Sequence, residues 1–109
     1  MRVDLPHVIA EYFAADRSVD SHGLSACFAA DARVTDEGQT HEGAAAIRRW
    51  KDAAAARYNY TAEPFEAAQE GDATVVRAHV RGNFPGGPVD LTYRFRLDGG
   101  KIAALEITA

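Results

Sequence analysis

The stretch 74–97, TVVRAHVRGNFPGGPVDLTYRFRL, reads as two strands that meet at the turn-forming residues 85–88. Apolar and polar residues alternate along both halves, which is typical of strands with one buried face. The proline- and glycine-rich connection predicts an antiparallel hairpin. Placing Phe84 opposite Val89 pairs apolar residues with apolar residues, whereas a slip of one residue would set each against a polar partner. The predicted apolar pairs are Gly82–Leu91, Val80–Tyr93, Ala78–Phe95 and Val76–Leu97.

The other face of this hairpin is basic. Its predicted pairs are Asn83–Asp90, Arg81–Thr92, His79–Arg94 and Arg77–Arg96. Like charges directly opposite one another are unfavourable. A turn at Gly71-Asp72 would place Glu66 opposite Arg77 and supply one acidic partner. We expect this outer face to form the interface of a homodimer, with a solvated face as the alternative.

Composition limits the classes of function. The 109 residues suffice for one domain, 1–109, and the 47% hydrophobic content predicts a folded core. A net charge of -4 disfavours a nucleic-acid partner. The single cysteine, Cys27, excludes an intrachain disulfide framework and is expected to be buried in a reduced compartment. We see no signal peptide and no apolar run long enough for a membrane span, so we expect a cytoplasmic protein without membrane contact.

The rest of the chain predicts helices first and strands afterwards. Three helices are expected, from a cap at Asp4 to about Ala15, from a cap at Asp20 or Ser21 to about Ala30, and from Ala44 to about Arg57. Short strands Ala32–Asp36 and Gln39–Glu42 would flank a Glu37-Gly38 turn, and further strands are expected at 58–70 and 101–108. This order predicts an α+β fold with the helices on one face of a curved sheet. The helices must cover the apolar face of the hairpin, because the other face is basic.

Three local motifs resemble a known family. They are Ala29-Ala30-Asp31-Ala32-Arg33-Val34, Gly43-Ala44-Ala45-Ala46-Ile47-Arg48 and Asp98-Gly99-Gly100-Lys101-Ile102. Their order resembles the SnoaL-like branch of the NTF2-like superfamily, small bacterial proteins with a cystatin-like cone fold. The resemblance implies three N-terminal helices packed against a strongly curved antiparallel sheet that encloses a pocket. The family includes isomerases, cyclases, dehydratases, hydrolases and binding proteins, so the fold alone does not name a reaction.

Within that superfamily, the first half of the chain resembles ketosteroid isomerase. Asp36, at the end of Val34-Thr35-Asp36, is similar to the general base, and Tyr12 matches the tyrosine of the oxyanion hole. The second oxyanion donor of the isomerase falls near Tyr93 or Thr92. The proline that follows the base is replaced here by Glu37. The resemblance implies that Asp36 moves a proton while Tyr12 and Tyr93 donate hydrogen bonds to an enolate oxygen.

The residues themselves support part of this assignment. Val34 should point to the core, and strand alternation then sends Asp36 inward as well. A partly desolvated carboxylate at a pocket mouth is a useful general base. Asp36 could instead only begin the Glu37-Gly38 turn. Tyr12 and Tyr93 could be core aromatics whose hydroxyls are satisfied locally.

We expect a largely aromatic pocket for a small apolar molecule. The residues predicted to line it are His41, Trp50, Tyr58, Phe65, Phe84 and Phe95. The motifs HxH, HExxH and GxSxG are absent, and no glycine-rich loop joins a strand to a helix. We therefore expect no cofactor and no metal.

Two functions fit these features. The first is a cofactor-independent acid/base enzyme of the isomerase, cyclase or dehydratase type that acts on a small apolar carbonyl-containing metabolite. The alternative is a protein that binds an apolar metabolite without converting it.

The pairing of the last strand bears on both functions, because regular pairing would turn Glu106 into the pocket. Burying Leu105 and Ile107 instead is worth roughly 1.5–3 kcal/mol each, so we predict a β-bulge near Ala103-Ala104 that turns Glu106 outward.

Overall fold

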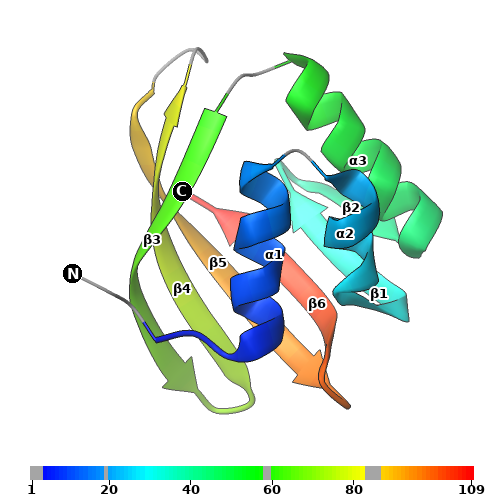
Figure 1. Ribbon diagram of the computed structural model, residues 1–109. Coiled ribbons are helices and arrows are strands. Elements are labelled where there is room, and N and C mark those ends of the chain that lie inside the picture. The colour runs from blue at the N-terminus through cyan, green and yellow to red at the C-terminus, as the bar shows by residue number, and fades with distance from the viewer. Residues whose placement is uncertain (1–3, 19, 58–59, 83–86) are drawn as a thin grey trace.

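The computed structural model describes residues 4–18, 20–57, 60–82 and 87–109 (Figure 1). The helices in this part of the chain are α1 (His7–Arg17), α2 (Ser21–Ala26) and α3 (Ala44–Arg57). The strands are β1 (Phe28–Asp36), β2 (Gln39–Glu42), β3 (Tyr60–Glu70), β4 (Ala73–Gly82), β5 (Val89–Asp98) and β6 (Lys101–Thr108). Tyr58 and Phe84, which were expected to line the pocket, lie outside the described residues.

The sheet is mixed rather than antiparallel throughout. The described strands follow the order β2-β1-β6-β5-β4-β3. Strands β3 to β6 form the expected antiparallel meander, but β1 runs parallel to β6. The prediction of a wholly antiparallel sheet was therefore wrong at β1, because the β1–β2 hairpin joins the main sheet along its last strand. The degree of curvature stays a prediction.

The register of the β4–β5 hairpin also differs from the predicted one. Val80 pairs with Val89 rather than with Tyr93, and Val76 pairs with Tyr93 rather than with Leu97, which is a displacement of four residues. An even displacement leaves every side chain on the same face, so alternation alone cannot distinguish the two registers. The inward set is unchanged, and Val76, Ala78, Tyr93 and Phe95 are all buried.

The helix boundaries show two further corrections. Helix α1 begins after Pro6 without a side-chain cap, so Asp4 is not its N-cap. Helix α2 has the expected cap, since the Asp20 carboxylate accepts a hydrogen bond from the Gly23 amide at 2.9 Å. This helix ends at Ala26 rather than near Ala30, because the next residues already pair with β6. The Ile102 amide donates to the carbonyl of Cys27 at 2.8 Å, which draws the segment into the sheet.

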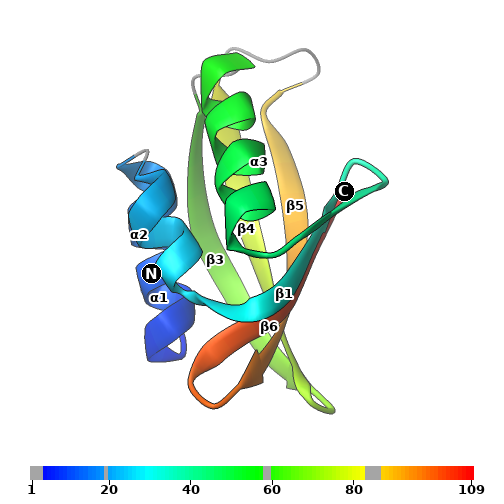
Figure 2. The same ribbon diagram turned by 90° about the vertical axis from the view of Figure 1, so that its right-hand side faces the viewer.

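The helices lie on one side of the sheet, as the two views show (Figures 1 and 2). The fully buried residues between the layers include Ile9 and Tyr12 of α1, Ile47 of α3 and Phe95 of β5. Cys27 is also buried, and burial raises the pKa of its thiol. Among the described residues, no helix combines the length and the apolar character needed to cross a membrane.

The predicted bulge in β6 is confirmed. Arg96 pairs with Ala104 and Leu97 pairs with Ile102, which leaves one extra residue on β6. Beyond this bulge Leu105 and Ile107 are buried, and Glu106 is exposed. An apolar side chain therefore occupies the inner face where a regular strand would have placed a carboxylate.

Acidic side chains of β3 accompany the arginines of the outer face. Ion pairs join Arg81 to Glu63 at 2.8 Å, Arg77 to Glu66 at 3.9 Å and Arg94 to Glu70 at 3.2 Å. The expected position of Glu66 opposite Arg77 is confirmed. Much of the positive charge on this face is thus offset within one chain.

Candidate functional site

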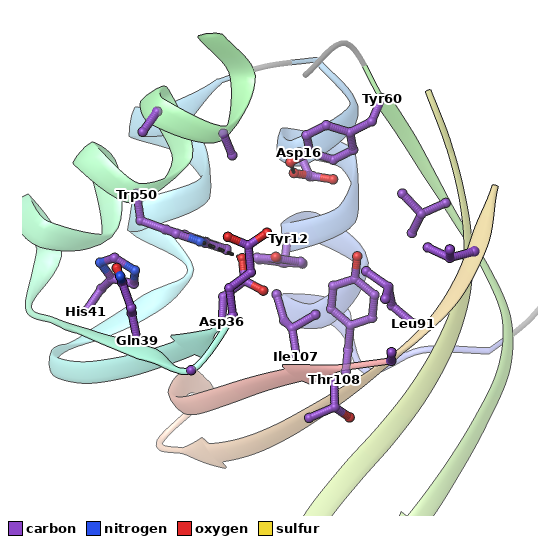
Figure 3. A pocket seen from close by; sticks show the side chains of 18 residues that line it. Tyr12, Asp16, Asp36, Gln39, His41, Trp50, Tyr60, Leu91, Ile107 and Thr108 are labelled. Atoms are coloured by element: carbon purple, nitrogen blue, oxygen red, sulfur yellow. Dashed lines mark hydrogen bonds between the residues drawn. The ribbon is translucent and has the colours of Figure 1, made fainter. Parts of the chain in front are cut away.

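A cavity of about 750 Å³ lies between the helices and the sheet (Figure 3). Helices α1 and α3, the β1–β2 turn, strands β3 to β5 and the end of β6 contribute to its lining. Most of its surface is apolar, with side chains such as Leu91 and Ile107 beside aromatic rings. The polar groups described next are therefore few and have defined positions, as in sites that bind small organic molecules.

Asp36 lines this cavity from the end of β1. Its neighbours across the sheet are Gln39 on β2 and Ile107 on β6. The tight turn that follows has positive φ angles at Glu37 (53°) and Gly38 (76°). A proline ring holds φ near −65°, so a proline cannot occupy position 37 in this turn. The chain departs from the ketosteroid isomerase pattern here in backbone conformation as well as in sequence.

Trp50 holds the Asp36 carboxylate in place. Its indole N–H donates a hydrogen bond to Asp36 Oδ2 at 3.0 Å. The ring of His41 lies against Trp50 with 6.2 Å between centroids, and both rings line the cavity. Among the described residues, Asp36 Oδ1 makes no hydrogen bond, so one oxygen of this carboxylate is oriented and the other is open to a ligand.

Tyr12 and Tyr93 also line the cavity, while their rings pack in the core. Tyr12 makes an edge contact with Phe95 at 5.4 Å, and Tyr93 stacks on Phe95 at 6.3 Å. Neither hydroxyl bonds to another described residue, and the described part of the chain holds no fully buried polar side-chain atom without a partner. Burial, together with the nearby charge of Asp16, raises the pKa of both phenols above their ordinary value of 10.0. Both hydroxyls therefore stay protonated and can donate hydrogen bonds to a ligand.

A buried ion pair forms a second polar group at the cavity. Lys51 is 1% exposed and Asp16 is 6% exposed. The Lys51 ammonium forms an ion pair with Asp16 Oδ1, and it also donates to the Asp16 backbone carbonyl at 3.2 Å and to the Tyr60 hydroxyl at 2.9 Å. The Tyr60 hydroxyl in turn donates to Asp16 Oδ1 at 2.9 Å. Burial and the Asp16 charge raise the pKa of Tyr60 above the ordinary range.

The family follows from a match that covers most of the chain. The model of the SnoaL-like domain family matches residues 9–105. This chain belongs to the SnoaL-like domain family. None of the curated protein sequences matches it.

Solved structures agree with that assignment. A Sinorhizobium meliloti protein described as a "putative polyketide cyclase" is 50% identical, with 96% of each chain covered and a TM-score of 0.93. A Catenulispora acidiphila protein with a ketosteroid isomerase-like fold, in complex with trimethylamine, is 24% identical, with 97% of this chain and 87% of that chain covered and a TM-score of 0.86. An NTF2-like protein of Cytophaga hutchinsonii is 11% identical, with 99% and 91% covered and a TM-score of 0.78. The α+β NTF2-like fold is thereby shown, and the Sinorhizobium protein is a true sequence relative of this SnoaL-like protein.

Two of the residues expected in the pocket do not line it. Phe95 is fully buried in the core beneath Tyr12 and Tyr93. Phe65 is 40% exposed, with the Arg77 guanidinium 5.2 Å from the centre of its ring. The register of β3 shifts between Pro64 and Glu66, and this irregularity breaks the alternation that would have turned Phe65 inward. Both pocket assignments were therefore wrong.

The ion pair of Asp16 and Lys51 was missed at the sequence level. Their spacing carried a signal, because Asp16 lies one helical turn after Tyr12 and Lys51 lies one turn after Ile47. Opposite charges on two apolar stripes predict a buried pair where those stripes meet.

The chemistry of the cavity suits an organic ligand. Over residues 4–18, 20–57, 60–82 and 87–109, no three His, Cys, Asp or Glu side chains gather in a way that could hold a metal ion. The groups that the cavity offers include the carboxylates of Asp16, Asp36 and Glu37, protonated phenols and aromatic faces.

Proposed function

We propose that this SnoaL-like protein is a cofactor-independent acid/base enzyme of the isomerase, cyclase or dehydratase type. Its substrate would be a small apolar compound with a carbonyl group. The observation that carries this proposal is the presence of the Asp36 carboxylate and the Tyr12 and Tyr93 hydroxyls in one largely apolar cavity. Such a set provides a proton acceptor and hydrogen-bond donors in surroundings where water competes little.

The proposed reaction begins with removal of a proton from the carbon next to the carbonyl. Asp36 Oδ1 accepts this proton while the C–H bonding electrons form the enolate C=C bond and the carbonyl electrons move to oxygen. Tyr12 and Tyr93 donate hydrogen bonds to that oxygen as its negative charge develops. Trp50 fixes the carboxylate through Oδ2, which limits the orientations that Asp36 samples. Protonated Asp36 then gives the proton back in one of three ways. It protonates another carbon of the substrate (isomerisation), or the oxygen of a second substrate carbonyl as the enolate carbon attacks that carbonyl (cyclisation), or a β-hydroxyl that the enolate expels as water (dehydration).

The relatives support this proposal at different levels. The description of the 50% identical Sinorhizobium protein as a "putative polyketide cyclase" favours the cyclase type among these reactions. The trimethylamine complex of the Catenulispora protein supports a small-molecule ligand for the shared fold.

A binding protein without catalytic activity is the second candidate. The hydrogen bond from Trp50 to Asp36 favours it, since this carboxylate already has a partner within the protein. In that case the polar groups of the cavity would recognise an apolar metabolite without converting it.

Deuterium exchange distinguishes the two functions. The protein would be incubated in D₂O with a panel of cyclic ketones that includes 1-tetralone, and loss of the C–H signal next to the carbonyl would be followed by NMR. Binding would be followed in a separate sample in H₂O, where the indole N–H of Trp50, the single tryptophan, gives one NMR signal that reports a ligand at the cavity. Saturable exchange above the rate in buffer supports the enzyme. Saturable shifts of the indole signal without deuterium exchange support the binding protein. If neither deuterium exchange nor a shift of the indole signal is seen, both functions are contradicted for ketones of this kind.

We also propose that the protein forms a homodimer through the outer face of the sheet and acts in the cytoplasm. Arg33, Arg94 and Arg96 line a shallow depression of about 350 Å³ on that face, together with Glu106. Arg96 makes no ion pair with another described residue. Glu42 of β2 pairs with Arg33, and glutamates of β3 pair with Arg77, Arg81 and Arg94, so the support for a dimer comes from this depression rather than from crowded charge.

A further inference from the structure

The group formed by Asp16, Lys51 and Tyr60 has no part in the proposed proton transfer. Asp16 and Tyr60 line the cavity. Figure 3 shows these two side chains next to each other and apart from the group formed by Asp36, Trp50 and His41. The cavity therefore contains two separate polar sites joined by apolar and aromatic surface.

The Asp16 carboxylate presents to this cavity an acceptor that no described residue occupies. Its Oδ1 accepts from the Lys51 ammonium and from the Tyr60 hydroxyl. Its Oδ2 makes no hydrogen bond with any residue that the structure describes, although the residue is only 6% exposed. Asp16 lines the cavity, where its carboxylate lies beside Tyr60 (Figure 3), so Oδ2 can meet a ligand there.

The neighbouring ammonium determines which group suits this acceptor. Lys51 has three N–H donors, and its three acceptors are Asp16 Oδ1, the Asp16 carbonyl and the Tyr60 hydroxyl. It therefore has no donor left for a ligand, but its charge offsets that of Asp16. The ion pair offers a hydrogen-bond acceptor without net charge, which suits a neutral hydroxyl better than an ammonium and disfavours a carboxylate or phosphate.

We propose that Asp16 is a specificity-determining residue that accepts a hydrogen bond from a ligand hydroxyl through Oδ2. The ligand class is then an apolar cyclic ketone that carries a hydroxyl group remote from its carbonyl. The proposal rests on the proposed function only in assigning the carbonyl to the Asp36 end of the cavity. Lys51 and Tyr60 act as positioning residues that hold the carboxylate in this orientation.

Matched ligands test this assignment in the wild-type protein. The probes are 1-tetralones that carry a hydroxyl at different positions of the aromatic ring, each compared with its methyl ether, which cannot donate. Dissociation constants would be measured by isothermal titration calorimetry. A hydrogen bond to a charged acceptor predicts that at least one hydroxyl isomer binds about tenfold more tightly than its ether. A preference below threefold for every isomer would overturn the proposal, and so would tighter binding of the corresponding aminomethyl compound.

Variants identify the residue responsible for any preference. Asp16→Leu combined with Lys51→Met removes the acceptor without leaving a buried charge unpaired, and the preference should fall below threefold. Asp36→Asn should retain the preference, whether or not exchange is observed, which separates this inference from the proposed function. A preference that survives the double variant, or that disappears in Asp36→Asn, would contradict the role of Asp16. If the double variant does not fold, the wild-type ligand pairs and Asp36→Asn still decide the outcome.

Discussion

Replacing the buried Lys51 by methionine should destabilise this protein more than the same replacement at the exposed Lys101. Methionine has a similar length and packs well in irregular apolar sites, so the main loss is the positive charge. The Lys51 side chain is 2% exposed and its ammonium makes three contacts with Asp16 and Tyr60. Removing one partner of a buried ion pair leaves the other charge without compensation and costs about 3–5 kcal/mol. That is a large part of the stability of about 5–15 kcal/mol that folded domains have.

Urea unfolding followed by circular dichroism would measure this loss. Lys101→Met is the matched control, because the exposed Lys101 donates a single hydrogen bond to the Ala26 carbonyl at 2.7 Å. We expect the control to lose about 1 kcal/mol or less. The double variant Asp16→Leu/Lys51→Met should recover most of the stability, since no buried charge remains unpaired. Equal effects of Lys51→Met and Lys101→Met, or a double variant as unstable as the sum of its single variants, would refute a buried ion pair.

Three further predictions concern the phenols and the outer face. Tyr12→Phe and Tyr93→Phe should each slow ketone exchange by about 10²–10³-fold while the melting temperature changes little, and NMR exchange rates that match wild type would exclude the phenols as donors. The pKa values of Tyr12, Tyr60 and Tyr93 are raised in the folded protein, so the stability that these neutral phenols contribute is complete below pH 10.0 and is lost as the pH rises above that value. Tyrosinate absorbance should therefore show these residues un-ionised at pH 10.0 until the chain unfolds. Full ionisation in a folded protein would contradict their burial. Sedimentation at micromolar concentration in moderate salt should give a dimer, and a monomer would exclude the proposed interface.

The sequence predicted the α+β architecture because its strongest patterns are local. Alternation in 74–97 identified the inward residues of β4 and β5, and the opposing costs of burying Leu105 or Glu106 predicted the bulge in β6. The register of the hairpin could not be obtained in this way, because a displacement of four residues keeps every side chain on its face. The parallel pairing of β1 with β6 depends on contacts between distant segments, which no local pattern records.

The residues of the candidate site were predicted where a local pattern marks them and not where contacts between distant segments decide. Asp36, Tyr12 and Tyr93 were chosen from strand parity and from a family resemblance, and the structure places all three at one cavity. Phe65 was misplaced because the irregularity in β3 has no clear mark in the sequence. The ion pair of Asp16 and Lys51 does have a mark in the sequence, because the apolar stripes of α1 and α3 each contain one charged residue, and the two charges are opposite.

The most direct test of the central claim is the ketone exchange rate of Asp36→Asn relative to wild type, with thermal melts of both proteins. Asparagine keeps the shape of the side chain and can still accept the hydrogen bond from Trp50, but it cannot accept a proton as a general base. We predict that the exchange rate falls by about 10²–10⁴-fold and that the melting temperature holds or rises, because an amide is easier to bury than a carboxylate. Equal exchange by the two proteins, or a loss of exchange that accompanies loss of the fold, would contradict the assignment of Asp36 as the base.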